Sequence, residues 1–419
     1  MIRSTLTILA ATLFVAAAAT AAAQQPDHPK GAIVYQVEHP IPGEVQPDVD
    51  LCLIDPTTGR DFALTSARAG RFDLEPDWSP DGRVVGFSRS AYGERGSERL
   101  RVIDSRGTTE RALAGGRGAN PSWSPNATEV AFVNAGIIVA PARGGATRRL
   151  VPPSLGGVGG PAWSPDGVTI AYVVQPLAIR LIQTDGSRDR ELVRGGTTPA
   201  WSPDARRIAF ARGDGRGNIH IWTVAVDGSS AVQVTRGAVN DLSPSWSPDG
   251  GWLSFVRQPS RGGQSDIYRV RASGANLTNV TRSPLQEAAP DWGPQSTQVP
   301  VGASVRPCTV TGTPGRDRLR GSERGDSIYG RGGADVIHAR AGPDIVDGGS
   351  GDDLIDAGSG TDVVGGGSGA DHIATGLNDD RIFARDKRRD AISCGGGRDA
   401  VVADRVDHID RDCEKVRRR

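Results

Sequence analysis

The chain has 419 residues, with 49 lysines and arginines against 49 aspartates and glutamates, so its formal net charge at pH 7 is zero. This balance excludes a protein that attracts nucleic acid through a global basic field, and we expect no nucleic-acid partner. The length permits about two or three domains. With 56 glycines and a single methionine, the composition favours short strands and tight turns over helices.

The first residues predict a secretory signal peptide over residues 1–23. Arg3 supplies a positive start, an apolar run extends from Leu6 to Ala19, and Ala21-Ala22-Ala23 provides small residues for cleavage. A retained membrane helix and a lipoprotein signal are the alternatives, but the run is short for a span and no cysteine follows it. We therefore expect a secreted, extracellular or cell-envelope protein after cleavage near Ala23, with no transmembrane segment in the mature chain.

One phrase recurs between residues 29 and 299, the last time as a remnant. Examples are EPDWSPDGRVVGFSR and GPAWSPDGVTIAYVV, in which a Ser-Pro-Asp-Gly turn precedes a short apolar strand. Successive tryptophans of the phrase are 45, 40, 38, 45 and 46 residues apart, which is the period of a propeller blade of four short strands. These tryptophans are Trp78, Trp123, Trp163, Trp201, Trp246 and Trp292.

The two ends of this region are complementary. The phrase at Trp292 lacks its following strand, whereas GAIVYQ and DVDLCLIDPTTGRDFALTS near the N-terminus supply the rest of a blade. We expect these strands to complete the blade begun at Trp292, which closes a ring and removes exposed sheet edges. The repeats resemble the TolB-like, WD40-like family of exported bacterial proteins. This resemblance implies a six-bladed β-propeller over residues 29–299 that binds a protein, a peptide or a cell-envelope polymer.

The propeller is predicted not to be an enzyme. Residues that recur in every blade build the blade, so we interpret the tryptophan and aspartate of the phrase as structural. The sequence contains no G-x-S-x-G elbow, and its histidines are scattered. They are His28, His39, His220, His338, His372 and His408. The alternative is a lyase-like enzyme active on glycans, for which a metal-binding, histidine-lined channel would be the distinguishing feature.

A second repeat, nine residues long, follows the propeller region. Three units, GGSGDDLID, AGSGTDVVG and GGSGADHIA, run without a break over residues 348–374. The same spacing extends to both sides, with an aspartate at the sixth position and an apolar residue two places later. The aspartates are Asp317, Asp326, Asp335, Asp344, Asp353, Asp362, Asp371 and Asp380. The apolar residues are Leu319, Ile328, Ile337, Val346, Ile355, Val364, Ile373 and Ile382.

A period of nine residues fits one tight turn plus one short strand, so two units make one coil of eighteen residues. The apolar residues then point inward, and aspartates eighteen residues apart stack and repel one another unless a cation lies between them. Carboxylates and turn carbonyls together are hard oxygen ligands of the kind that suits Ca²⁺. A flexible, acidic, glycine-rich linker is the alternative, but a linker need not keep an apolar residue in register.

These units resemble the hemolysin-type, or RTX, calcium-binding repeat over about residues 312–402. The resemblance implies a parallel β-roll whose sixth-position aspartates and turn carbonyls bind Ca²⁺. The expected carboxylate ligands are Asp335, Asp344, Asp353, Asp362, Asp371 and Asp380. The glycines expected in the metal-binding turns are Gly349, Gly351, Gly358, Gly360, Gly367 and Gly369. Residues 300–311 are assigned to a linker and residues 312–419 to the β-roll with a C-terminal cap, so the whole chain is expected to be all-β.

The four cysteines permit two disulfides in an exported chain. Cys394 and Cys413 are 19 residues apart, close to one coil, so we expect them on adjacent coils within disulfide reach. A bond between Cys52 and Cys308 would fasten the closing blade. Zinc binding is the alternative, but the sequence contains no C-x-x-C pair and no histidine cluster.

The sequence therefore predicts an exported, non-enzymatic, calcium-binding protein in which Ca²⁺ is mainly structural. The β-roll could instead serve as a surface-adhesion module, and cell fractionation would separate these roles. No oligomer is expected.

Overall fold

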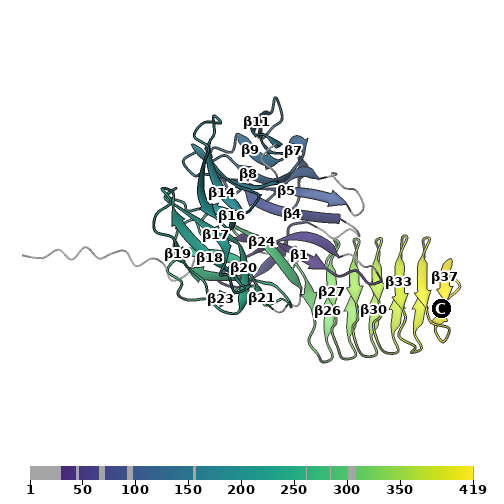
Figure 1. The fold of residues 1–419 in the computed structure, drawn as a ribbon. Helices are drawn as coiled ribbons and strands as arrows, with labels where there is room; N and C mark the ends of the chain where they lie inside the picture. The colour runs from purple at the N-terminus through teal and green to yellow at the C-terminus, as the bar shows by residue number, and fades with distance from the viewer. Residues whose placement is uncertain are drawn as a thin grey trace, which may run out of the picture.

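The computed structural model describes residues 30–43, 47–65, 71–91, 98–153, 157–260, 262–283, 285–300 and 308–418. The predicted signal peptide (1–23) and most of the predicted linker (300–311) lie outside these residues. All regular elements of the described residues are β-strands, so the predicted all-β class is confirmed. Figure 1 shows a propeller from which a narrow solenoid extends on one side. The described part of the chain contains no helix that could span a membrane.

The propeller is built from antiparallel strands in four hydrogen-bonded sheets. The first sheet contains β24 (Gln286–Trp292), β1 (Ile33–His39), β2 (Asp48–Ile54), β3 (Asp61–Ala63), β4 (Arg71–Trp78), β5 (Val84–Ala91), β6 (Arg99–Asp104) and β7 (Glu110–Arg117). The second contains β8 (Ala119–Trp123), β9 (Glu129–Val133), β10 (Ile137–Pro141) and β11 (Arg148–Val151). The third contains β12 (Val158–Trp163), β13 (Thr169–Val174), β14 (Ala178–Gln183) and β15 (Arg190–Arg194). The fourth contains β16 (Gly196–Trp201), β17 (Arg207–Gly213), β18 (Ile219–Ala225), β19 (Val232–Gln233), β20 (Val239–Trp246), β21 (Trp252–Pro259), β22 (Asp266–Arg271) and β23 (Thr278–Asn279).

The two eight-stranded sheets are each joined by one parallel bridge. Val49 of β2 pairs with Phe72 of β4, and Ile219 of β18 pairs with Asn240 of β20. Dividing the sheets at these bridges leaves units of four strands, as expected for propeller blades. The number of six blades is compatible with this division and stays a prediction.

The repeated Trp-Ser-Pro-Asp-Gly phrase forms a hydrogen-bonded turn between the first two strands of a unit. At the first copy, Ser79 Oγ donates to Asp81 Oδ1 at 2.7 Å and accepts from the Val84 amide at 3.1 Å. The copy at Ser247 has the same two bonds, to Asp249 and from Trp252. The repeated serine and aspartate therefore hold the turn closed.

The N-terminal strand completes the sheet begun by the last tryptophan phrase. β1 pairs antiparallel with β24, and Ile33 lies opposite Trp292. On its other side β1 pairs with β2 along its whole length. The predicted joining of the two ends of the propeller region is therefore confirmed. The hairpin of β1 and β2 belongs to the sheet that contains both ends of the propeller region.

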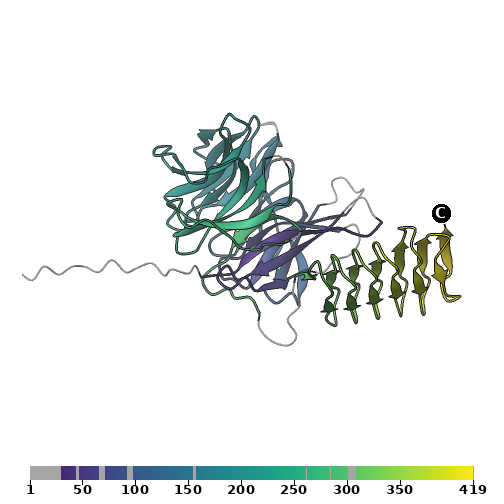
Figure 2. The same cartoon turned by 90° about the horizontal axis from the view of Figure 1, so that it is seen from below.

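The solenoid is a stack of short parallel strands in two sheets, seen as separate coils in Figures 1 and 2. The seven-stranded roll sheet contains β25 (Val310–Thr311), β27 (Ser327–Tyr329), β29 (Ile345–Asp347), β31 (Val363–Gly365), β33 (Arg381–Ala384), β35 (Ala400–Ala403) and β37 (Lys415–Arg418). The six-stranded roll sheet contains β26 (Arg318–Arg320), β28 (Val336–His338), β30 (Leu354–Asp356), β32 (His372–Ala374), β34 (Ala391–Ser393) and β36 (His408–Ile409).

The apolar residue of each nonapeptide forms the core of the roll. Ile355 pairs with Ile337 and Ile373, eighteen residues away on each side, which is the predicted length of a coil. Of the eight predicted inward residues, seven are buried in one core cluster, and Leu319 packs against it partly buried. The predicted parallel β-solenoid is confirmed.

Candidate metal centre

The nonapeptide aspartates form two rows along the roll. Row one, defined as Asp335, Asp353 and Asp371, precedes strands of the six-stranded roll sheet. Row two, defined as Asp344, Asp362 and Asp380, precedes strands of the seven-stranded roll sheet. The structure thus brings together aspartates eighteen residues apart, as the period predicts.

Within each row, backbone hydrogen bonds fix the carboxylates. The Asp335 amide donates to Asp353 Oδ1 at 2.8 Å, and the Asp353 amide donates to Asp371 Oδ1 at 2.9 Å. In row two, the Asp362 amide donates to Asp380 Oδ1 at 2.9 Å. One oxygen of each accepting carboxylate is therefore committed to the ladder, and the other is left for a different partner.

The second oxygens of five of the row carboxylates are buried. Within the described residues, the Oδ2 atoms of Asp335, Asp353, Asp362, Asp371 and Asp380 are buried and accept no hydrogen bond. A buried, ionised oxygen without a partner is strongly unfavourable unless a cation neutralises it. Orphaned oxygen atoms at this spacing fit a hard divalent cation such as Ca²⁺.

The glycine turns bring backbone close to these carboxylates. A Cβ atom added to Gly348 would lie 2.5 Å from Asp353 Oδ2, and one added to Gly366 would lie 2.5 Å from Asp371 Oδ2. A side chain at these two row-one positions would therefore crowd the carboxylate. The equivalent row-two positions carry Ala357 before Asp362 and Thr375 before Asp380, so this feature belongs to row one.

The six glycines named from the sequence all have a positive φ. The values are 95° for Gly349, 124° for Gly351, 95° for Gly358, 153° for Gly360, 97° for Gly367 and 149° for Gly369. The carbonyls of Gly349 and Gly358 each accept an amide hydrogen bond from the next coil, at 2.7 and 2.9 Å. A carbonyl has a second lone pair, so these bonds leave one position for a metal. Their assignment as ligands stays a prediction.

Four aspartates of the two rows have raised pKa values because they are buried. Burial raises the pKa of Asp353 to about 6 and those of Asp362, Asp371 and Asp380 to about 7. The ladder hydrogen bonds act in the opposite direction, and repulsion from neighbouring aspartates raises these pKa values further. Because a metal binds the ionised carboxylate, calcium binding near neutral pH would release protons.

The ladders extend beyond the residues predicted as ligands. The Asp371 amide donates to Asp390 Oδ1 and the Asp380 amide to Asp399 Oδ1, both at 2.9 Å. The rows then end on Asp407 and Glu414. The register that resumes at Asp390 and Asp399 is visible in the sequence. Asp407 and Glu414 are 17 and 15 residues from their donors, so no nine-residue spacing marks them.

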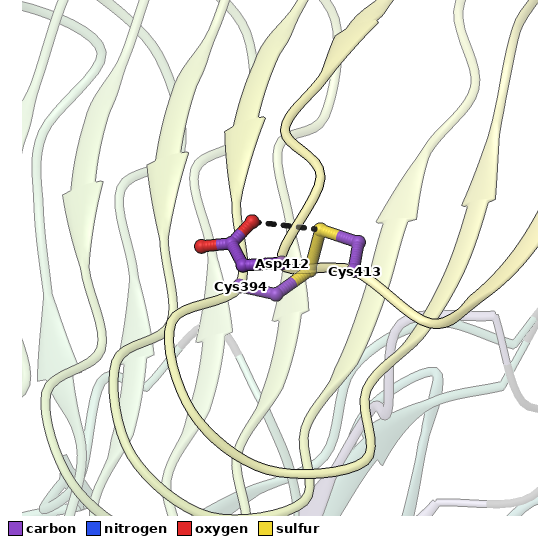
Figure 3. Close-up of side chains that lie close together, drawn as sticks. All are labelled: Cys394, Asp412 and Cys413. Atoms are coloured by element: carbon purple, nitrogen blue, oxygen red, sulfur yellow. Dashed lines mark hydrogen bonds between the residues drawn. A yellow bond between two sulfur atoms is a disulfide. The ribbon is translucent and has the colours of Figure 1, made fainter.

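A separate group of ligand-type side chains lies at the end of the roll. Cys394, Asp412 and Cys413 lie close together, and Asp412 Oδ1 is 3.8 Å from Cys413 Sγ (Figure 3). The two sulfurs are joined in a disulfide with Cα atoms 5.2 Å apart, so they are not thiolate ligands. The second disulfide joins Cys52 and Cys308. Both pairings are those proposed from the sequence.

The propeller has a central cavity of about 690 Å³, lined by one Pro-x-Trp segment from each repeat. The residue before each of these prolines has a φ between 44° and 55°, and the strand register shifts at the same point. These residues are Glu75, Asn120, Gly160, Thr198, Ser243 and Ala289. Bulges re-aim side chains, so the repeated backbone presents a different side chain from each repeat.

The fold and the aspartate rows define the class of this protein, a β-propeller joined to a solenoid of calcium-binding type. Comparison with protein families agrees. Residues 144–304 match the TolB beta propeller domain. Four overlapping matches between residues 311 and 386 are to the RTX calcium-binding nonapeptide repeat. The chain thus combines a TolB-like propeller with RTX-type repeats, and neither family description names a reaction.

The fold of TolB from Acinetobacter baumannii and that of a nidogen/laminin chain support the propeller fold. TolB from Acinetobacter baumannii is 18% identical, with a TM-score of 0.53 over 63% of this chain and 67% of TolB. A putative TolB from Agrobacterium tumefaciens is 20% identical, with a TM-score of 0.48 over 60% and 88%. A chain of a nidogen/laminin complex is 8% identical, with a TM-score of 0.50 over 62% and 98%. No match was found among curated proteins.

Proposed function

We propose that this chain is an exported calcium-binding protein in which Ca²⁺ is structural. Rows one and two bind the ions between successive coils, with turn carbonyls as further ligands, and a six-bladed propeller over residues 29–299 binds a protein, a peptide or a cell-envelope polymer. The observation that carries the calcium role is the line of buried aspartate oxygens without a hydrogen-bond partner among the described residues. The match to RTX repeats supports it.

The test is a calcium titration of the mature chain by calorimetry and circular dichroism. The comparison is a triple variant, Asp353→Asn, Asp362→Asn and Asp371→Asn. Asparagine keeps the oxygen that accepts the ladder hydrogen bond and removes the charge that a cation needs. We expect the wild type to bind calcium with a gain of β-structure and the variant to show neither. Extracellular calcium modules have dissociation constants of up to about 1 mM. A wild type that does not respond at about this calcium concentration would therefore contradict the calcium role.

The binding role of the propeller is supported by its cavity. Side chains that differ between repeats, such as Glu75, Asn120 and Thr198, line this cavity, and such variable positions are where propellers of one architecture acquire different ligands. Export is supported by the two disulfides, because such bonds persist in oxidising compartments. N-terminal sequencing of the radiolabelled protein recovered after secretion would test cleavage near Ala23.

The lyase-like alternative is tested directly. Among the described residues, no histidine lines the cavity, whereas a metal-dependent glycan site of the expected kind would be lined by histidines. Incubation with uronic-acid polymers, followed by ultraviolet absorbance of unsaturated products, should show no reaction. Metal-dependent release of such products would support the enzyme instead.

A further inference from the structure

The loop after β1 lies against the roll. Ile41 is buried in a cluster with Ile345 and Val363, and Phe383 packs against the same cluster. The Tyr329 hydroxyl donates to the Pro40 carbonyl at 3.4 Å. In Figures 1 and 2 the purple hairpin of β1 and β2 reaches from the propeller along the first coils of the roll. We define residues 40–43 as the docking loop.

The two outer faces of the roll differ in a way that matches this contact. On the seven-stranded roll sheet, the outward Ile345 and Val363 are only 3% and 6% exposed. On the six-stranded roll sheet, the outward Leu354 is 49% exposed. Gly365 continues the docked face, and a Cβ atom there would lie 2.9 Å from Pro42 Cβ. The outer face of the seven-stranded roll sheet is therefore apolar and covered where the docking loop lies. The outer face of the six-stranded roll sheet is exposed at the equivalent position, Leu354.

The face of the seven-stranded roll sheet that contacts the docking loop belongs to strands directly preceded by the row-two aspartates. Ile345 directly follows Asp344, Val363 directly follows Asp362, and Phe383 lies three residues after Asp380. A cation bound between these aspartates, as proposed above, would hold in place the strands that contact the docking loop. Without a cation, the buried charges of row two oppose the stacking of the same strands.

The docking loop connects the strands that close the propeller. Its hairpin contributes β1, which pairs with β24, and β2, whose Cys52 is bonded to Cys308 at the entrance to the roll. Tyr329 of the first coils shares a core cluster with Trp252 and Trp292 of the propeller. The closing sheet and the roll therefore share one packed interface.

From this arrangement we infer that calcium loading of row two stabilises the propeller, through the docking loop and the sheet that closes the ring. The inference rests on the proposed calcium role of the roll and adds a coupling between its two parts. Coupling is reciprocal, so weakening the docking loop also weakens calcium binding, although the loop contributes no ligand.

Tryptophan fluorescence reports the unfolding of the propeller separately from that of the roll in the full chain. All eight tryptophans lie between Trp78 and Trp292, and the roll has none. Thermal unfolding followed by tryptophan emission therefore reports on the propeller, while calorimetry reports on calcium binding. We expect saturating calcium to raise the midpoint of the tryptophan transition by about 5 °C.

The first variant pair tests the loop. In Ile41→Ser the calcium-induced shift of the tryptophan midpoint should disappear, and calcium affinity should fall about fivefold. The matched control, Val168→Ser, changes an exposed residue of a propeller turn, 49% exposed, and should keep both properties. An Ile41→Ser protein with the full shift and unchanged affinity would overturn the inference.

The second pair tests the row. Asp362→Asn removes a row-two charge beside the docked Val363, and Asp353→Asn removes a row-one charge beside the exposed Leu354. We expect the tryptophan shift to fall more in Asp362→Asn than in Asp353→Asn, and equal losses would overturn the assignment to row two. If the wild type binds calcium without any tryptophan shift, the coupling fails while the proposed function stands. If calorimetry shows no calcium binding, both fail.

Discussion

At the scale of single residues, glycine serves two different purposes in the roll. In the turns, a positive φ favours it, as at Gly349. Gly365 lies instead inside a strand, at the ninth position of its unit, where other units place Asp347, Asp356 or Ala374. Its explanation is the contact with Pro42.

This contact gives a residue-scale prediction. Gly365→Val adds a side chain that strands generally favour, but here it would collide with the docking loop and destabilise the calcium-loaded protein by about 1–3 kcal/mol. The matched control is Ala374→Val at the same repeat position on the exposed face of the other roll sheet, which should change stability by less than about 0.5 kcal/mol. Urea unfolding measures both, and equal effects would contradict the role of Pro42.

At the scale of elements, the strand β24 has an acid whose environment differs from that of its counterparts. Asp73 and Asp241 lie opposite Arg89 and Arg257 on the next strand and bond them at 2.6 and 2.7 Å. Glu287 occupies the corresponding place, but Val37 lies opposite it. Burial therefore raises the pKa of Glu287 to about 8, partly offset by hydrogen bonds from Thr281 and Ile267.

The raised pKa makes stability depend on pH. The folded protein keeps the Glu287 proton up to about pH 8, whereas the unfolded chain loses it near pH 4.5. Its contribution to stability is therefore full below pH 4.5 and is lost as pH rises through 8. Glu287→Gln removes this dependence, by about 1 kcal/mol per pH unit between these limits.

Urea unfolding of wild type and Glu287→Gln at about pH 5.5 and 7.5, both at saturating calcium, checks this prediction. The difference between the two proteins isolates Glu287 from the aspartates of the roll, which titrate in both. We expect the variant to gain stability relative to the wild type as pH rises. Parallel pH profiles would show that Glu287 is ionised in the folded state.

At the scale of the whole molecule, one disulfide joins the propeller to the entrance of the roll and the other lies within the last coils of the roll. The second bond gives a prediction. The bond between Cys394 and Cys413 closes a short loop, with a sequence separation of 19 residues, which corresponds to about 3 kcal/mol of restricted unfolded-chain entropy. Replacing both cysteines by serine should loosen the last coil while the coils of Asp353 and Asp362 remain ordered. Hydrogen exchange should rise over residues 394–418 alone, and uniform loss of protection across the roll would contradict this local role.

Much of the fold could be predicted because its signals are local and repeated. The turn residues after each tryptophan, the nine-residue spacing of Asp353 and its equivalents, and the inward Ile355 each report on their own coil or blade. The propeller, the roll and the bond between Cys394 and Cys413, which are about one coil apart, follow from such signals. The pairing of β1 with β24 is inferred from complementary ends of the repeat region, and the bond between Cys52 and Cys308 is proposed only as a fastening of that closure. Asp407 and Glu414 could not be found in this way, because they end the aspartate rows at irregular spacings.

The amino-acid pattern is enough to predict the two architectures and the rows of aspartates, because turn chemistry and periodicity act over a few residues and repetition multiplies a weak preference into a strong one. The folded chain is needed to see that the docking loop lies on the seven-stranded roll sheet, that Gly365 makes room for Pro42, and that Val37 rather than an arginine lies opposite Glu287. These contacts join residues that are more than 200 positions apart in the chain, and no local pattern records which distant surface a segment will meet.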